Sequence, residues 1–203
     1  MGRRALYGPV SGGANGSGAI FHVAFDGEKW RDQDVYSFGP YGSGDGYQPD
    51  GRVAFTPSDA LVGVTADGGG NTIDYYHQGG GTLYSIGSSY TILHSFCAKP
   101  ACADGEYPGG PIAMDNQGDI FGTTEGGGNA DEQSGEGVLF RMGADGKYKV
   151  LHVFCSLADC ADGGSPVDGV TSAPSGVFFG ATSYGGSHPT QGYAGGTVFM
   201  LKP

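Results

Sequence analysis

Two long loops of this sequence carry the side chains best suited to bind a ligand. The candidates are Tyr75, Tyr76 and His77 in residues 67–80, and Tyr184, His188 and Tyr193 in residues 183–195. An exposed tyrosine ring can stack on the apolar face of a sugar, while neighbouring Asp or Asn side chains accept hydrogen bonds from the sugar hydroxyls. These six residues are the predicted ligand contacts, and a carbohydrate is the ligand that their chemistry indicates.

The chain is strongly acidic, with 21 Asp and Glu against 10 Lys and Arg and a formal net charge of −11. This balance argues against a nucleic-acid partner, because phosphate contacts need a basic surface. Loop carboxylates suit calcium, but no segment has the dense aspartate spacing of a calcium loop, so we prefer the interpretation that they keep a Gly-rich surface soluble. No cofactor is predicted from them, and calcium stays open.

Recognisable catalytic motifs are missing from the sequence. It contains no G-x-S-x-G elbow, no H-E-x-x-H pair and no phosphate-binding loop, so no catalytic residue is predicted. Paired loop carboxylates are plentiful, and a glycoside hydrolase or lyase that uses scattered loop residues remains an alternative.

The four cysteines form two C-x4-C loops, Cys97 with Cys102 and Cys155 with Cys160, and the equivalent loop at residues 39–44 has neither cysteine. Joint presence and joint absence are what a local disulfide predicts, whereas a core thiol could be lost singly. Zinc is the rival interpretation, although the spacing is unusual for it and no histidine lies within these loops. Disulfides belong to oxidising compartments, so an exported protein is predicted, even though residues 1–4 lead straight into a strand without a signal peptide.

Two further polar positions recur at one spacing. An Asp-Gly followed by a Pro comes after each of three strands, with the aspartates at Asp45, Asp104 and Asp162. We interpret these aspartates as Asx-type turns that repeat with the structure, in preference to a functional ring of carboxylates. The histidines His94 and His152 share one strand position that Tyr36 takes in the first copy. We interpret them as packing residues, because catalysis rarely needs one residue per repeat.

These positions recur because the chain is built from repeats of about 58 residues. The clearest copy, residues 111–154, holds four short runs of apolar, β-branched or aromatic residues separated by Asp, Asn and Gly turns, the signature of β-strands. The second strand contains a recurring glycine at Gly8, Gly63, Gly122 and Gly180, which are spaced by 55, 59 and 58 residues. The third strand recurs as GAIF, GTLY, GVLF and GTVF, and the fourth as VYSF, LHSF and LHVF.

Repeats of this length with four strands each predict an all-β protein, a β-propeller-like array of four-stranded antiparallel blades. The predicted repeats are residues 5–51, 52–110, 111–166 and 167–203, together forming a single domain. Two are full, while the first lacks its first strand and the last lacks its fourth. Unpaired sheet edges invite association with neighbouring chains, so self-association is predicted. No apolar run approaches the roughly 20 residues that a membrane span needs.

The recurring pattern resembles the GloVer tandem repeat of bacterial surface proteins described as choice-of-anchor proteins. The matching segments are residues 120–124 (IFGTT), 196–199 (GTVF), 93–96 (LHSF) and 104–105 (DG). The resemblance implies export to the cell surface and a repeat β architecture, and it implies no activity, substrate or catalytic residue.

Three functions follow from these observations. The first is an exported structural or adhesive module that self-associates through its incomplete terminal copies. The second is a glycan-binding module that uses the Tyr- and Asp-rich loops, which the blade geometry places on one face. The third is a hydrolase or lyase.

Overall fold

The computed structural model describes residues 5–40, 42–70, 79–128, 135–186, 189–190 and 193–203, without the side chains of 189–194. Within these residues the chain is all-β, and the only helical segments are the short 3-10 turns η1 (Pro100–Cys102) and η2 (Ala158–Cys160). No helix in the described part of the chain is long and apolar enough to cross a membrane.

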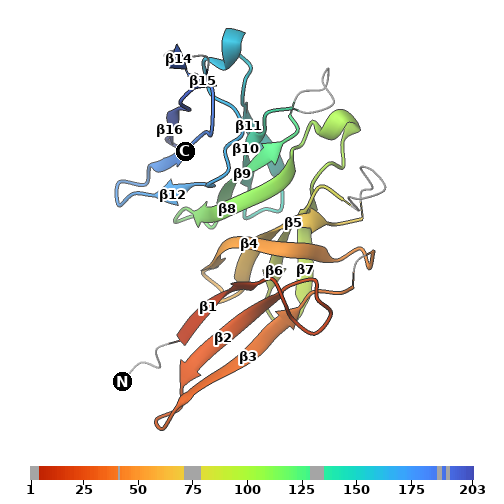
Figure 1. The fold of residues 1–203 in the computed structure, drawn as a ribbon. Helices are drawn as coiled ribbons and strands as arrows, with labels where there is room; N and C mark the ends of the chain where they lie inside the picture. Colours follow the sequence, from red (N-terminus) through yellow and green to blue (C-terminus); the bar gives the residue numbers. More distant parts are fainter. Residues whose placement is uncertain (1–4, 41, 71–78, 129–134, 187–188, 191–192) are drawn as a thin grey trace.

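Apart from β14 and β15, the described strands form four antiparallel sheets that follow one another along the chain (Figure 1). Sheet I contains β1 (Ala5–Val10), β2 (Ala19–Phe25) and β3 (Trp30–Ser37). Sheet II contains β4 (Gly46–Phe55), β5 (Leu61–Gly68), β6 (Thr82–Ile86) and β7 (Tyr90–Ser95). Sheet III contains β8 (Glu106–Met114), β9 (Ile120–Gly126), β10 (Val138–Met142) and β11 (Tyr148–Val153). Sheet IV contains β12 (Thr171–Ser172), β13 (Phe178–Ala181) and β16 (Val198–Leu201).

In two places the strands differ from the sequence-based prediction. Strands β4 and β8 begin at Gly46 and Glu106, earlier than the predicted starts at Arg52 and Pro111. The Asp-Gly-x-x-Pro segment is therefore not only a loop, because it pairs with the next strand, as Pro49 does with Thr65. A proline is tolerated there because β4 and β8 are edge strands that need no N–H on their outer side. In addition, residues 183–195 include a small two-stranded ribbon, β14 (Pro189–Thr190) with β15 (Tyr193–Ala194), where a loop was predicted.

A glycine–aromatic pair fixes the register of every sheet. In each repeat the glycine of the second strand lies opposite an aromatic residue of the third, and a Cβ at the glycine would come within 2.2–3.0 Å of that aromatic side chain. The pairs are Gly8 with Phe21, Gly63 with Tyr84, Gly122 with Phe140, and Gly180 with Phe199. This close approach explains why the glycine recurs at one position of the repeat.

Sheets II and III are buried on both faces, because each packs against the sheet before it and the sheet after it. Figure 1 shows sheets I and IV at opposite ends of this succession. Three apolar clusters connect the sheets. They join Ile20 and Phe38 to Leu61 and Tyr84, Val62 and Leu83 to Ile120 and Phe140, and Phe121 and Leu139 to Phe178.

Replacing Tyr84 by Phe is expected to stabilise the protein by about 1 kcal/mol, because a buried hydroxyl without a hydrogen-bond partner costs about 1–3 kcal/mol. The Tyr84 side chain is fully buried, and among the described residues its hydroxyl has no partner. The other three sheets carry phenylalanine at this position. The measurement is urea unfolding of Tyr84→Phe beside wild type.

Tyr148→Phe is the matched control, because the Tyr148 hydroxyl donates a hydrogen bond to the Asp104 carbonyl oxygen over 2.6 Å. Its removal is expected to cost about 1 kcal/mol. An equal loss of stability in both variants would show that the Tyr84 hydroxyl has a partner after all.

Candidate functional site

Of the six predicted ligand residues, only Tyr184 has a described side chain. Tyr75, Tyr76, His77 and His188 lie outside the described residues, and Tyr193 is described only as part of the backbone of β15. Glycan contact by these residues therefore stays a prediction.

Tyr184 itself is half-buried and held in place by its neighbours. Its ring lies against Gly164, where a Cβ would come within 2.5 Å of the ring, and its carbonyl oxygen accepts the hydroxyl of Thr182 and the N–H of Gly164, each over 3.0 Å. These contacts attach the loop at residues 183–186 to Gly164, which lies in the segment before β12. Its ring face on the Gly164 side is not available to a sugar.

The best-defined polar cluster of the molecule is built around Asp104. Its carboxylate is fully buried and accepts hydrogen bonds from His94 Nε2 at 3.0 Å, from Lys99 N–H at 3.0 Å and from Ala98 N–H at 3.2 Å. The N–H donors belong to the loop that the Cys97–Cys102 disulfide closes. The carboxylate thus ties a tight loop to the histidine of the preceding strand.

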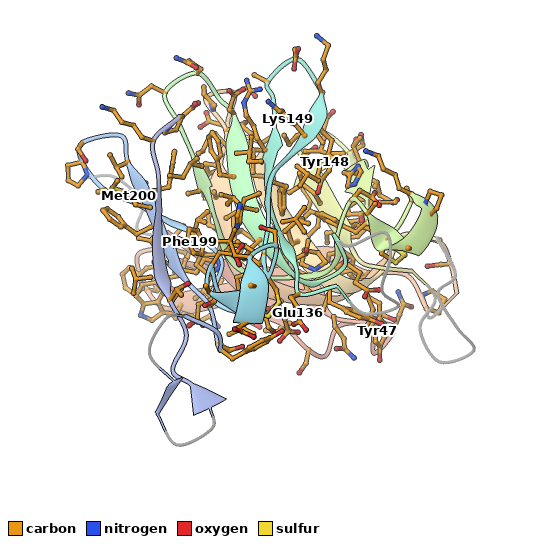
Figure 2. The ribbon with its side chains drawn as sticks, turned by 90° about the horizontal axis from the view of Figure 1, so that it is seen from above. Tyr47, Glu136, Tyr148, Lys149, Phe199 and Met200 are labelled. Atoms are coloured by element: carbon orange, nitrogen blue, oxygen red, sulfur yellow. A yellow bond between two sulfur atoms is a disulfide. The ribbon has the colours of Figure 1, made fainter. Side chains whose placement is uncertain are left out.

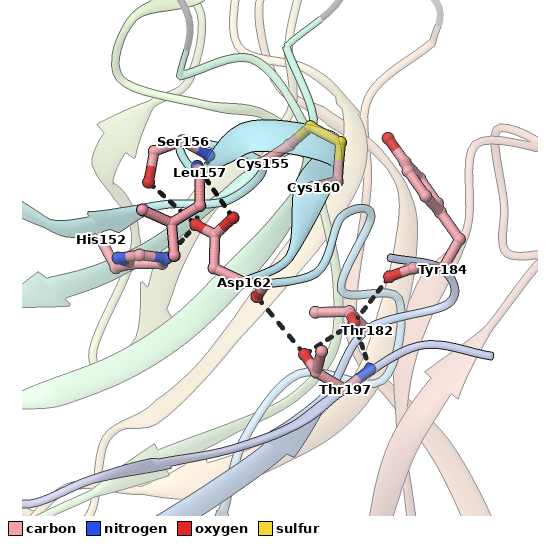
Figure 3. Close-up of a disulfide and its surroundings, with 9 residues drawn as sticks. All are labelled: His152, Cys155, Ser156, Leu157, Cys160, Asp162, Thr182, Tyr184 and Thr197. Atoms are coloured by element: carbon pink, nitrogen blue, oxygen red, sulfur yellow. Dashed lines mark hydrogen bonds and ion pairs between the residues drawn. A yellow bond between two sulfur atoms is a disulfide. The ribbon is translucent and has the colours of Figure 1, made fainter. Parts of the chain in front are cut away.

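The same cluster recurs around Asp162 (Figure 3). Its carboxylate accepts His152 Nε2 at 3.0 Å, the Ser156 hydroxyl at 2.8 Å and the Leu157 N–H at 3.1 Å, beside the Cys155–Cys160 disulfide.

The first copy keeps this arrangement without cysteines. The Asp45 carboxylate accepts the Tyr36 hydroxyl at 2.7 Å and the Gly39 N–H at 2.8 Å. Burial and the neighbouring Asp45 carboxylate raise the pKa of Tyr36, which keeps its hydroxyl protonated as a donor. The Asx-type turn predicted for the three aspartates is therefore wrong in its geometry, because each carboxylate bonds mainly to residues that precede it. A structural role for them, which the sequence favoured, is what these bonds support.

Burial raises the pKa of Asp104, but the hydrogen bonds from His94 and from the Lys99 N–H outweigh burial and bring the pKa below its ordinary value. Burial is also the largest influence at Asp162, and the Leu157 N–H and Ser156 hydroxyl overcome it there. A carboxylate whose pKa is lowered by folding stabilises the protein fully above the unfolded value of about 3.9, and this stabilisation is lost as the pH falls through the lower folded pKa.

One aromatic position links the first two of these three clusters, those of Asp45 and Asp104, to the following sheet. The Tyr36 ring stacks on Tyr90 of sheet II at a centroid distance of 4.3 Å and an angle of 8°. The His94 ring stacks on Tyr148 of sheet III at 3.8 Å and 5°. In both pairs the partner is the first residue of the fourth strand of the next sheet. Sheet IV has no fourth strand among the described residues, and the His152 side chain is 41% exposed where that of His94 is 15% exposed.

A second joint between consecutive sheets is made by the backbone. The residue before the repeated proline donates its N–H to a carbonyl of the previous sheet. This carbonyl lies just before β2, β6 or β10, the third strand of the repeat, and Tyr107 donates in this way to Gly80 over 2.8 Å. Gln48 and Ser165 make the same bond to Ser17 and Glu136, over 3.0 and 2.8 Å. These three donors have φ values of 54°, 54° and 51°, an unusual conformation for residues other than glycine that this joint fixes.

The described residues offer one group of potential metal ligands, Cys97, Cys102 and Glu106. Its two cysteines are joined in a disulfide, so they do not act as thiolate ligands. Of the loop carboxylates behind the predicted calcium alternative, Asp74, Asp131 and Glu132 lie outside the described part of the chain, and calcium binding stays a prediction.

Consecutive antiparallel sheets joined by identical polar clusters and backbone bonds define a tandem-repeat β-protein. The chain belongs to the family described as the Gloeobacter/Verrucomicrobia repeat, whose model matches residues 2–199. This confirms the resemblance to the GloVer repeat that the sequence motifs indicate.

Other comparisons are more distant. Among solved structures the chain is similar to a protein provisionally named a gluconolactonase, with 15% sequence identity and a TM-score of 0.46 over 97% of this chain and 68% of the other. No curated protein matches the chain.

Asp104→Asn is expected to lower the free energy of unfolding at pH 7 by about 1–3 kcal/mol, because an amide cannot accept all the bonds of the buried carboxylate. The loss should shrink as the pH falls below about 4, where the wild-type carboxylate becomes protonated on unfolding. Urea unfolding at pH 7 and at pH 3 measures both effects.

Asp159→Asn is the control for this prediction, since Asp159 is exposed in the equivalent loop of the next copy and asparagine tolerates its φ of 56°. It is expected to change stability by less than about 0.5 kcal/mol. A loss for Asp104→Asn that stays the same at both pH values would contradict the charge-dependent role of the carboxylate.

Proposed function

We propose that this chain is a structural module of an exported repeat protein and that it associates with further repeat units through its two incomplete end sheets. The observation that carries the proposal is the exposure of apolar side chains in these sheets at positions that are buried in the inner sheets.

The exposure is clearest in the third strand of sheet IV. Val198 is 81% exposed, whereas Leu83 and Leu139, at the same position of sheets II and III, are 0% and 5% exposed. In those sheets the next sheet covers the position. A valine with this exposure costs solvation free energy that a neighbouring sheet would recover, since apolar burial contributes about 25 cal/mol per Å².

Sheet I has a matching exposed position on its opposite face. Leu6 is 64% exposed, whereas Leu61 and Ile120, at the same position of sheets II and III, are each 4% exposed. Inside the chain, the face that carries Val198 always packs against the face that carries Leu6. The two open faces are therefore complementary in the way that consecutive sheets are, which favours head-to-tail association of repeat units.

We infer that the sheets are blades of a propeller-like domain with repeats at 5–51, 52–110, 111–166 and 167–203, of which the second and third are full. The first strands support this arrangement, because β4 contacts β8 and β8 contacts β12, as expected of strands that line a common axis. Export is supported by the two disulfides and by membership of the repeat family. The glycan-binding and hydrolase or lyase alternatives stay predictions from the sequence.

Light scattering on the oxidised protein tests the association. Wild type is expected at a multiple of 20.7 kDa, in a concentration-dependent equilibrium. Val198→Glu is expected to shift this equilibrium to the monomer, because it places a charge in the apolar contact. Ser88→Glu is the control, since it adds the same charge to an exposed turn of sheet II. A wild-type mass of 20.7 kDa at every concentration would overturn self-association.

A further inference from the structure

We propose that the open edge of sheet IV is a binding site for one extended strand of another polypeptide, with a sequence like that of the fourth strand of the repeat. That sequence is Tyr-x-(Ile or Val)-Leu-His-x-Phe, the pattern shared by residues 90–96 and 148–154. The inference rests on the proposed role of the end sheets, and it specifies the partner, its register and the residue that recognises it.

The site begins with an unpaired backbone edge. In sheets II and III the third strand pairs on its outer side with the fourth, β6 with β7 and β10 with β11. Strand β16 occupies the third position of sheet IV and, among the described strands, pairs only with β13. Its outer N–H and C=O groups are therefore available to an added antiparallel strand.

The inner sheets predict the register of the added strand. The tyrosine of the pattern lies opposite Ile86 in sheet II and Met142 in sheet III, which corresponds to Leu201 in β16. The histidine lies opposite Leu83 and Leu139, which corresponds to Val198. A bulge follows Leu83 and Leu139 in both sheets, so a bulge between Val198 and Phe199 is expected in the bound state.

The side chains of β16 are already oriented for this pairing. Figure 2 shows Phe199 directed toward sheet III and Met200 directed away from it. Phe199 packs on Phe154 with a centroid distance of 5.1 Å, which anchors β16 while its edge stays open. In sheets I to III the phenylalanine that ends the pattern donates its N–H to the glycine carbonyl before the third strand, over 2.9–3.0 Å. Gly196 offers the same carbonyl in sheet IV.

His152 gives the site its specificity. Its Nε2 is bound to Asp162 at 3.0 Å, and its ring is perpendicular to that of Phe154, at 85° and 5.0 Å, so the ring orientation is fixed (Figure 3). At the two equivalent places the ring of Tyr36 or His94 is stacked on a tyrosine of the next fourth strand. An added strand would bring its tyrosine to this position over His152. The Asp162 carbonyl then corresponds to the Asp104 carbonyl that accepts the Tyr148 hydroxyl.

Charge also favours a strand of this kind. The chain carries a formal net charge of −11, so a basic strand is attracted to it. Residues 147–154, with the sequence KYKVLHVF, contain two lysines and no acidic residue, which makes them a suitable probe.

The test is a titration of a labelled synthetic peptide of residues 147–154 with the full oxidised chain, followed by fluorescence anisotropy. Saturable binding is expected, and a peptide with its tyrosine replaced by alanine should bind roughly three- to tenfold more weakly, the loss of one aromatic pair. The protein variant His152→Ala should weaken binding of the intact peptide to a similar extent and leave the alanine peptide little changed. Ser88→Glu is the control protein, and the peptide variant tests the stacking even if His152→Ala folds poorly.

Absence of saturable binding at about millimolar protein, or binding that ignores both the peptide tyrosine and His152, would overturn the inference. The two proposals fail separately. A wild-type oligomer that shows no saturable binding of the peptide would refute the strand site and leave self-association standing. A monomer that binds the peptide would establish the strand site and refute self-association.

Discussion

The packing of each sheet between two others is the constraint on which the rest of this structure depends. A four-stranded sheet of this size has two apolar faces, and neither can be buried by the sheet alone. In the inner sheets Leu83 and Tyr84, neighbours on one strand, point to opposite faces and are both fully buried, one by the following sheet and one by the preceding sheet. Stability is therefore shared between neighbours, and a repeat unit without neighbours leaves a face in water.

The polar clusters serve the same constraint at the outer rim of the sheets. A buried carboxylate such as Asp104 would be costly by itself, but it satisfies loop N–H groups and one histidine whose ring stacks on the next sheet. The cluster thus couples the conformation of a loop to the position of the following sheet. The disulfide closes the same loop in two copies, while hydrogen bonds, including those to Asp45, hold the loop of the first copy.

Much of this organisation could be predicted from the sequence, because it is local or periodic. The glycine at Gly63 and its equivalents predicts the second strand, since only glycine fits under the opposite ring. What could not be predicted depends on contacts between distant segments. The pairing of Pro49 with Thr65 depends on β4 being an edge strand. The contact of Gly164 with the Tyr184 ring joins two segments whose proximity no sequence spacing indicates. The sequence does contain a signal for the stacking of His94 on Tyr148. In the preceding copy the same two positions hold Tyr36 and Tyr90, so both members of the pair are aromatic in each case.

The two ends of the array differ in what would complete them, although both expose apolar residues. Among the described strands, sheet I contains none that carries the repeated proline, whose preceding residue, Gln48, Tyr107 or Ser165, donates its N–H in the other sheets. Sheet IV has no described strand over His152, but it has its first strand and its backbone bond to sheet III through Ser165. If strands add as proposed, sheet IV offers a histidine ring held by Asp162, an open edge and a defined register, whereas sheet I would also need the strand that makes the backbone bond. Because preorganisation lowers the entropy cost of binding, the edge at β16 is where addition of a strand would begin.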